Sequence, residues 1–192
     1  MISEGGKKYQ VIYADPPWSY KGAMYERGGA ENHYNTESQQ SLKNMPVGSL
    51  AAQNSSLFMW ATFPLLQEAL DLGAAWGFKY RTVAFVWVKK NKVANTPFVG
   101  MGFYTRANAG IVLHFTKGKA LPRQSKNVES IIFSEIGKHS QKPDEVRQRI
   151  KRLFGSVPSI ELFARSRKGF FPDYEYEGWD VYGNEVNNSI SL

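Results

Sequence analysis

The fold is decided by the stretch Tyr9-Gln10-Val11-Ile12-Tyr13-Ala14-Asp15-Pro16-Pro17-Trp18. Its first six residues form a short apolar, β-branched and aromatic run, and the prolines that follow cannot donate to a strand ladder. We therefore expect a buried central strand over 9–14 that stops at Asp15. In an open α/β sheet, a turn that directly follows such a strand lies at the ligand-binding edge.

Strand and helix patterns alternate along the rest of the chain. The clearest helix is expected over 142–154, because Pro143 suits its first position, an apolar stripe follows, and Gly155 ends it. Further helices are expected over 38–45 and 64–76, and further strands over 56–61, 80–89, 111–116, 130–133 and 160–163. This order predicts an α/β protein with a mostly parallel sheet, helices on both faces, and ligands at the carboxyl ends of the strands. The segments 19–34 and 90–109 show no period and are expected to be long functional loops.

The composition bounds the class of protein. A length of 192 residues with 42% hydrophobic residues predicts one domain over 1–192, with 1–8 and 187–192 as flexible tails. No Cys and three His exclude disulfides, thiolate zinc sites and cysteine nucleophiles, so we expect no metal. No apolar run approaches the ~20 residues that span a bilayer, and the start lacks a secretory apolar segment. We expect a cytoplasmic protein with no membrane partner.

The charge points to an anionic partner. The chain carries 24 Lys and Arg against 17 Asp and Glu, a net charge of +7, which favours nucleic acid, although a merely solvated positive face is the alternative. One connection holds four cations and no acid, and it is expected to follow phosphates unless it is an ordinary solvated loop. These cations are Lys117, Lys119, Arg123 and Lys126.

The turn after the first strand suits the methylation of an exocyclic amine. The N6 amine of adenine is a poor nucleophile, since its lone pair is delocalised into the ring, and acceptors for its N–H groups let the nitrogen rehybridise. Asp15 supplies a carboxylate acceptor, the prolines hold a backbone carbonyl in place, and Trp18 can stack on the base. The structural alternative is a proline turn in which Trp18 is a core residue and Asp15 caps a backbone amide.

Four signatures in this order resemble the MT-A seventy family of N6-adenine methyltransferases over about residues 9–186. They are Ala14-Asp15-Pro16-Pro17-Trp18, His139-Ser140-Gln141-Lys142-Pro143-Asp144-Glu145, Ile160-Glu161-Leu162-Phe163-Ala164-Arg165, and Gly178-Trp179-Asp180 with Gly183-Asn184-Glu185. The resemblance implies S-adenosylmethionine as methyl donor and a Rossmann-like fold in circularly permuted order. Many relatives carry a Glu where this chain has Ala109-Gly110, so a role for that acid is not expected here.

The resemblance also implies the donor-binding residues. Lys142 precedes a helix N-terminus, where a cation and free N–H groups can hold a carboxylate together; a surface lysine paired with Asp144 or Glu145 is the alternative. The family assigns the donor's methionine carboxylate to this place. The catalytic set is Asp15, Pro16, Pro17 and Trp18, and the donor-binding set is Asp15, Lys142, Glu161, Arg165, Arg167, Asn184 and Glu185.

The two long loops resemble the loops with which the family closes over the target base. Aromatic side chains there can stack on an unpaired base, and cations can follow the backbone, whereas ordinary loop polar residues are the alternative. The predicted substrate-binding residues are Tyr34, Lys90, Tyr104, Arg106 and Asn108, and Lys89 and Lys92 are further backbone candidates. His114 is expected to be a hydrogen-bonded core residue, and His139 to orient the Lys142 turn.

We therefore expect an S-adenosylmethionine-dependent N6-adenine methyltransferase, with DNA preferred over RNA because the chain is short. A duplex substrate requires that the adenine be flipped out. The alternatives are an RNA N6-adenosine methyltransferase, a catalytically silent nucleic-acid-binding subunit, and methylation of cytosine N4 or a protein glutamine. A second copy of the chain or a separate subunit is the further partner considered.

Overall fold

The computed structural model describes residues 6–18, 38–93, 96–100, 102, 104–137, 141–165 and 176–192. Within them, a seven-stranded sheet has the order β5-β3-β4-β2-β1-β6-β7. The strands are β1 (Tyr9–Ala14), β2 (Ala51–Ala61), β3 (Lys79–Lys90), β4 (Ala109–Lys117), β5 (Ile131–Glu135), β6 (Ser159–Leu162) and β7 (Asp180–Tyr182). The helices are α1 (Gln39–Asn44), α2 (Val47–Leu50), α3 (Leu66–Ala75) and α4 (Glu145–Phe154), and a 3-10 turn, η2 (Phe63–Leu65), precedes α3.

Strand β1 lies inside this sheet. It is parallel to β2 on one side and to β6 on the other, and β6 is parallel to β7 as β3 is to β5. Strand β4 is antiparallel to both of its neighbours, β2 and β3. The predicted α/β class is confirmed, and the sheet is mixed.

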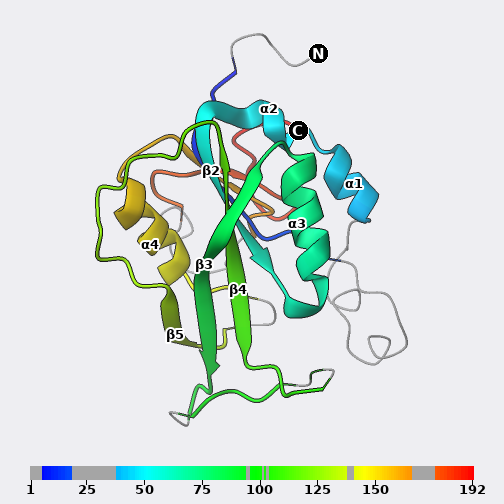
Figure 1. Ribbon diagram of the computed structural model, residues 1–192, viewed down its shortest axis with the longest axis vertical. Helices are drawn as coiled ribbons and strands as arrows, with labels where there is room; N and C mark the ends of the chain where they lie inside the picture. The colour runs from blue at the N-terminus through cyan, green and yellow to red at the C-terminus, as the bar shows by residue number, and fades with distance from the viewer. Residues whose placement is uncertain are drawn as a thin grey trace.

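Helices cover both faces of the sheet, as Figure 1 shows with α3 and α4 on opposite sides of β3 and β4. Ile12 and Ala14 of β1 pack in a core with α1 and α3, whereas Val11 and Tyr13 pack in a second core with α4. This alternation is the period of two expected of a strand that is buried on both faces. None of the helices in the described residues is long and apolar enough to cross a membrane.

Most predicted elements are found, and the differences lie at their ends. Strand β2 begins at Ala51, five residues before the predicted start, because its first half is partly exposed and shows no apolar run. Helix α4 begins at Glu145 with Asp144 as N-cap, so Pro143 lies before the helix rather than at its first position. Helix α2 and strand β7, of four and three residues, are too short to leave a periodic signal.

Described parts of both expected tails make contacts with the rest of the chain. Ser189 donates its backbone N–H to Val181, and Ile190 and Leu192 pack against the first core. At the other end, Lys7 forms an ion pair of 2.7 Å with Asp180. Two apolar side chains spaced two apart in a polar segment are too small a signal to detect in the sequence.

His114 is hydrogen-bonded as the sequence predicts, but it is half-buried at the margin of the core. Its ring stacks on Phe58 with centroids 4.8 Å apart, and Nε2 lies 3.2 Å from Oγ of Ser56. Burial, and then the charge of Arg81, lower its pKa from 6.5 to about 4. The ring is therefore neutral at pH 7.

This shift predicts how stability depends on pH. The pKa is about 4 in the folded chain and about 6.5 in the unfolded chain, so the unfolded chain binds the proton first as the pH falls. The free energy of unfolding should fall between pH 6.5 and 4, by at most about 1.4 kcal/mol per pH unit from this group. Urea unfolding of the wild type and of His114→Gln at several pH values measures it, and an unchanged slope in the variant would contradict the assignment.

Candidate active site

The chain changes direction between β1 and β6. These strands are parallel neighbours, but the chain leaves β1 towards β2 and leaves β6 towards β7, on opposite sides. Ligands of open α/β sheets bind in the crevice outside the carboxyl ends of two such strands. Asp15 stands there directly after β1, and its N–H donates to the carbonyl of Leu162 at 3.4 Å. The predicted turn therefore lies at a topological switch point.

The buried side chain of Trp18 fixes the turn to the core. This side chain is 7% exposed, and its indole N–H donates to the carbonyl of Trp60 at 3.2 Å. Its backbone N–H donates to the carbonyl of Pro16 at 2.9 Å. Trp18 thus lies in the core, as in the structural alternative, and its stacking on a base stays a prediction. Pro16 and Pro17 are buried beside it.

Asp15 and Lys142 contact each other, although 126 residues separate them in the chain. The ammonium group of Lys142 donates to both carboxylate oxygens of Asp15, at 2.8 and 2.7 Å. It also lies over the ring of Trp60, 5.6 Å from the centroid. The alternative partners pair with arginines of α4, Asp144 with Arg147 and Glu145 with Arg149. The structure joins the predicted catalytic carboxylate to the predicted donor-binding cation.

Tyr13 and Trp60 form a hydrogen-bonded pair of aromatic side chains next to this ion pair. The indole N–H of Trp60 donates to the phenol oxygen of Tyr13 at 2.5 Å. Burial, with the charge of Glu161 adding to it, raises the pKa of Tyr13 well above its ordinary value. The phenol therefore stays protonated and serves as a neutral support.

A second ion pair lies one strand away. Arg147 of α4 donates to the carboxylate of Glu161 on β6 at 2.7 Å, and both side chains are 12% exposed. The guanidinium also lies 4.7 Å from the ring centroid of Tyr176, whose hydroxyl donates to the carbonyl of Arg165 at 2.7 Å. Glu161 and Arg165, both predicted to bind the donor, are thus tied together through residues that sequence reasoning did not select.

The backbone just after β6 has a positive φ and a close contact with the segment after β7. Phe163 has a φ of 61°, in the left-handed region that costs a bulky residue energy and is typical of functional sites. Ala164 then donates to the carbonyl of Tyr182, and a Cβ on Gly183 would lie 2.1 Å from the carbonyl oxygen of Ala164. Only glycine allows this approach. It brings the exposed Asn184 and Glu185 to the end of β6.

The predicted substrate residues are only partly brought to this place. Tyr104, Arg106 and Asn108 are exposed in the connection between β3 and β4. This connection folds back on itself through bridges between residues 90 and 97 and between 100 and 107. Lys90 is half-buried at the end of β3. The predicted residues Tyr34 and Arg167, and also His139, lie outside the described residues.

The basic connection after β4 lies elsewhere than expected. Because β4 is antiparallel, it ends at the edge of the sheet opposite Asp15, and Lys117 donates there to the carbonyl of Gly48. The connection then runs beside α4, where Gln124 donates to the carbonyl of Leu153. It therefore does not extend from the candidate site, and the direction of β4 is the reason.

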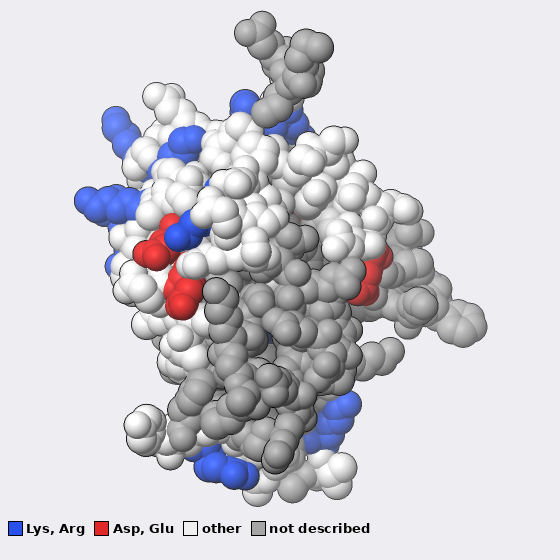
Figure 2. Space-filling model, turned by 90° about the vertical axis from the view of Figure 1, so that its right-hand side faces the viewer, with Lys and Arg blue, Asp and Glu red and all other residues white. Residues whose placement is uncertain are grey.

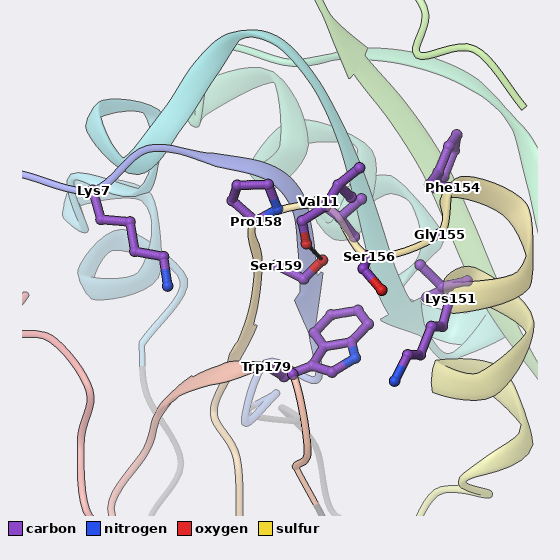
Figure 3. Close-up of a pocket in the computed structure, with 12 residues that line it drawn as sticks. Lys7, Val11, Lys151, Phe154, Gly155, Ser156, Pro158, Ser159 and Trp179 are labelled. Atoms are coloured by element: carbon purple, nitrogen blue, oxygen red, sulfur yellow. Dashed lines mark hydrogen bonds between the residues drawn. The ribbon is translucent and has the colours of Figure 1, made fainter. Parts of the chain in front are cut away.

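A cavity of about 300 Å³ lies at that opposite edge (Figure 3). Lys7, Trp179 and Lys151 stand around it on three different segments, and Val11 and Ser159 mark the starts of β1 and β6. None of the predicted site residues within the described ranges lines this cavity. The candidate site thus lies at the other end of the same strands, away from this cavity.

Sequence reasoning missed the supporting side chains Trp60, Arg147 and Tyr176. Trp60 was part of an expected strand and Arg147 of an expected helix, but neither carries a motif. The apolar stripe of α4 did predict which face packs on the sheet, and Arg147 follows Val146 at the margin of that stripe. That position was the available signal.

Comparison with known proteins places the chain among methyltransferases. A sequence model of the family described as MT-A70, the family suggested by the motifs, matches residues 9–185. The type II methyltransferase M.MunI of a Mycoplasma species is 38% identical over 205 residues, covering 97% of this chain and 82% of that protein.

Two longer relatives match with lower identity. The N(6)-adenosine-methyltransferase MT-A70-like protein of Arabidopsis thaliana is 26% identical, covering 93% of this chain and 24% of that protein. The N(6)-adenosine-methyltransferase catalytic subunit METTL3 of Homo sapiens is 25% identical, covering 94% of this chain and 28% of that protein. The chain corresponds to one segment of each.

The buried ion pair predicts a large effect on stability. Arg147→Met leaves the Glu161 carboxylate without this cation and should lower the free energy of unfolding by about 3 kcal/mol, whereas Lys151→Met, exposed on the same helix, should change it little. Adding Glu161→Gln to Arg147→Met should restore part of the loss. Urea unfolding of the four proteins measures this, and equal losses for both single variants would contradict it.

Proposed function

The chain belongs to the MT-A70 family, and from this premise we propose that it transfers a methyl group from S-adenosylmethionine to the N6 amine of adenine in DNA. The observation that carries the proposal is the contact between Asp15 and Lys142 at the switch point between β1 and β6. This contact places the carboxylate of Asp15, which can accept an N–H of an amine, next to the ammonium group of Lys142, which can bind a carboxylate. Those are the two groups that the acceptor base and the methyl donor present.

Asp15 is the residue proposed to act on the base. Its carboxylate accepts an N–H of the amine, and the carbonyl of Pro16, which keeps a second lone pair besides its bond to Trp18, accepts the other. These bonds localise the nitrogen lone pair, which forms the new C–N bond as the methyl group leaves the sulfonium sulfur. The extra proton then passes to water or to Asp15. Trp18 keeps the turn in place.

The proposed donor site lies on the β6 and β7 side of Asp15. Lys142 meets the methionine carboxylate, and Arg165, Asn184 and Glu185 meet the ribose and adenine. Glu161 is held by Arg147 and orients this edge. The donor chemistry fits these residues, because a nucleoside with a charged amino-acid end needs a cation at one end and donors and acceptors at the other. Arg167 completes the proposed set.

The proposed fold is Rossmann-like and circularly permuted. In the chain, the segment with Asp15 comes first and the segment with Glu161 comes later, yet their strands are neighbours and parallel. The single strand that opposes its neighbours, β4, lies on the acceptor side of β1. Residues 1–192 form one catalytic domain in this proposal.

DNA is preferred as substrate because the relative with 38% identity, a type II methyltransferase, matches nearly the whole chain. The RNA N6-adenosine methyltransferase alternative draws on the longer relatives of about a quarter identity. A silent subunit is disfavoured by the intact turn from Asp15 to Trp18. If the DNA is duplex, the adenine must leave the stack to reach the crevice.

The deciding experiment is product analysis. Purified protein with labelled S-adenosylmethionine and either duplex DNA, single-stranded DNA or RNA should form N6-methyldeoxyadenosine in a DNA pool, identified by mass spectrometry after digestion. Asp15→Ala should lose at least about 100-fold in rate, since it removes a hydrogen-bond acceptor that acts in the transition state. Asp71→Ala, an exposed carboxylate of α3 that pairs with Lys43, is the control and should keep the rate.

Four other results would each lead to a different conclusion. Product in the RNA pool alone would assign the RNA activity, and modified cytosine would assign another amine. No product together with no heat of donor binding would indicate a silent subunit, whereas donor binding without product would point to a missing partner.

A further inference from the structure

Lys89 lies on the same face of the sheet as Lys142. Along β3, alternate side chains face α4, and Phe85 and Trp87 belong to the core beneath that helix. Lys89 is the next residue in this series, and its ammonium group lies over the ring of Trp87, 5.3 Å from the centroid. Lys90, which the sequence favoured as a substrate contact, follows the other series and faces away.

Two indoles join the two lysines into one surface. The rings of Trp60 and Trp87 meet edge to face, with centroids 6.1 Å apart. The ammonium of Lys142 lies over the first ring and that of Lys89 over the second. Gly110 of β4 lies between the two rings. A Cβ at this position would lie 3.4 Å from Trp60 and 3.7 Å from Trp87. We call Trp60, Trp87, Lys89 and Lys142 the lysine platform.

The lysine platform has more positive than negative charge. Asp15 forms its ion pair with Lys142. Among the ion pairs of the described residues, none includes Lys89. Burial, and then the charge of Lys142, lower the pKa of Lys89, so its charged form is disfavoured in the protein alone. An anion over the platform would favour the charged form of Lys89 and so oppose both effects.

The order of strands decides which anion fits. Apart from Lys142 and Asp15, the proposed donor residues of the described chain lie on or just after β6 and β7, on one side of Asp15, whereas Lys89 lies on β3, beyond β2 and β4 on the other side. A base held at Asp15 therefore has the donor on one side and its own sugar and phosphate on the side of Lys89. Strand β3 ends at the lower end of the molecule in Figure 1. At that end, Figure 2 shows Lys and Arg but no Asp or Glu among the coloured residues in view.

Resting on the proposed function, we propose that Lys89 binds a backbone phosphate of the target DNA nucleotide from the lysine platform. Two backbone hydrogen bonds join Lys89 to the connection between β3 and β4. Its N–H donates to the carbonyl of Asn108 at 2.9 Å, and its carbonyl accepts from Phe98 at 2.8 Å. Phosphate binding would therefore also anchor the connection that carries Tyr104 and Arg106.

The test is the salt dependence of DNA binding. Lys89→Met keeps an apolar stem over Trp87 and removes the charge, so the slope of log K against log salt should become shallower by about 0.9 for duplex DNA. Affinity at 0.1 M salt should fall about tenfold, and Lys89→Arg should restore most of it. Lys79→Met, on the exposed start of the same strand at the opposite edge, is the matched control and should keep slope and affinity.

Stability separates binding from a structural role. Lys89→Met should unfold at the same or a higher temperature than the wild type, because it removes a partly buried charge next to Lys142. A residue that merely supports the fold would lower both stability and affinity. The dissociation constant of S-adenosylmethionine, measured by calorimetry, should stay within about twofold of the wild type.

The outcomes distinguish this inference from the proposed function. If the wild type methylates DNA but Lys89→Met keeps the full slope and affinity, the inference fails and the function stands. If Lys89→Met weakens donor binding instead, Lys89 holds the donor carboxylate and not a phosphate. If the wild type neither binds nor methylates DNA, both fail.

Discussion

Two parallel ladders, one to β2 and one to β6, hold strand β1 in a single register. Ile12 lies opposite Leu57 on one side and Ile160 on the other, and alternate side chains of β1 enter the two cores. A slip by one residue would exchange these faces and disrupt the packing of both cores. The first residue beyond the strand, Asp15, is therefore placed by the packing of the whole sheet, and not by its own loop.

Helix α4 and the segment just before it bring two cations to carboxylates at neighbouring strands. Lys142 reaches Asp15 after β1, and Arg147 reaches Glu161 on β6. Cations near a helix N-terminus are unfavourable for its dipole, so these two ion pairs also offset a cost. The same contacts tie the helix and the segment before it to both sides of the switch point.

The sheet order separates two functions within the proposed reaction. Donor residues gather on β6 and β7, while Trp60, Trp87 and Lys89 lie on β2 and β3. Asp15 stands between these groups, at the one position where a methyl group and an amine would meet. Because β4 is antiparallel to β2 and β3, the connection 91–108 before it lies at the edge of the sheet where Asp15 stands. The basic connection 117–128 after it lies at the opposite edge.

The sequence by itself determined the elements whose signals are local: strand 9–14 with its proline turn, the helix before Gly155, the hydrogen-bonded His114, and the motifs that identify the family. It could not determine the direction of β4, the docking of Ile190 and Leu192, or the contacts of Arg147 with Glu161 and of Lys89 with Trp87. These depend on which distant strands pair and in what register. Hydrophobic periodicity records which face of a segment is buried, but it carries no information about its neighbour or its direction, and only the folded sheet decides those.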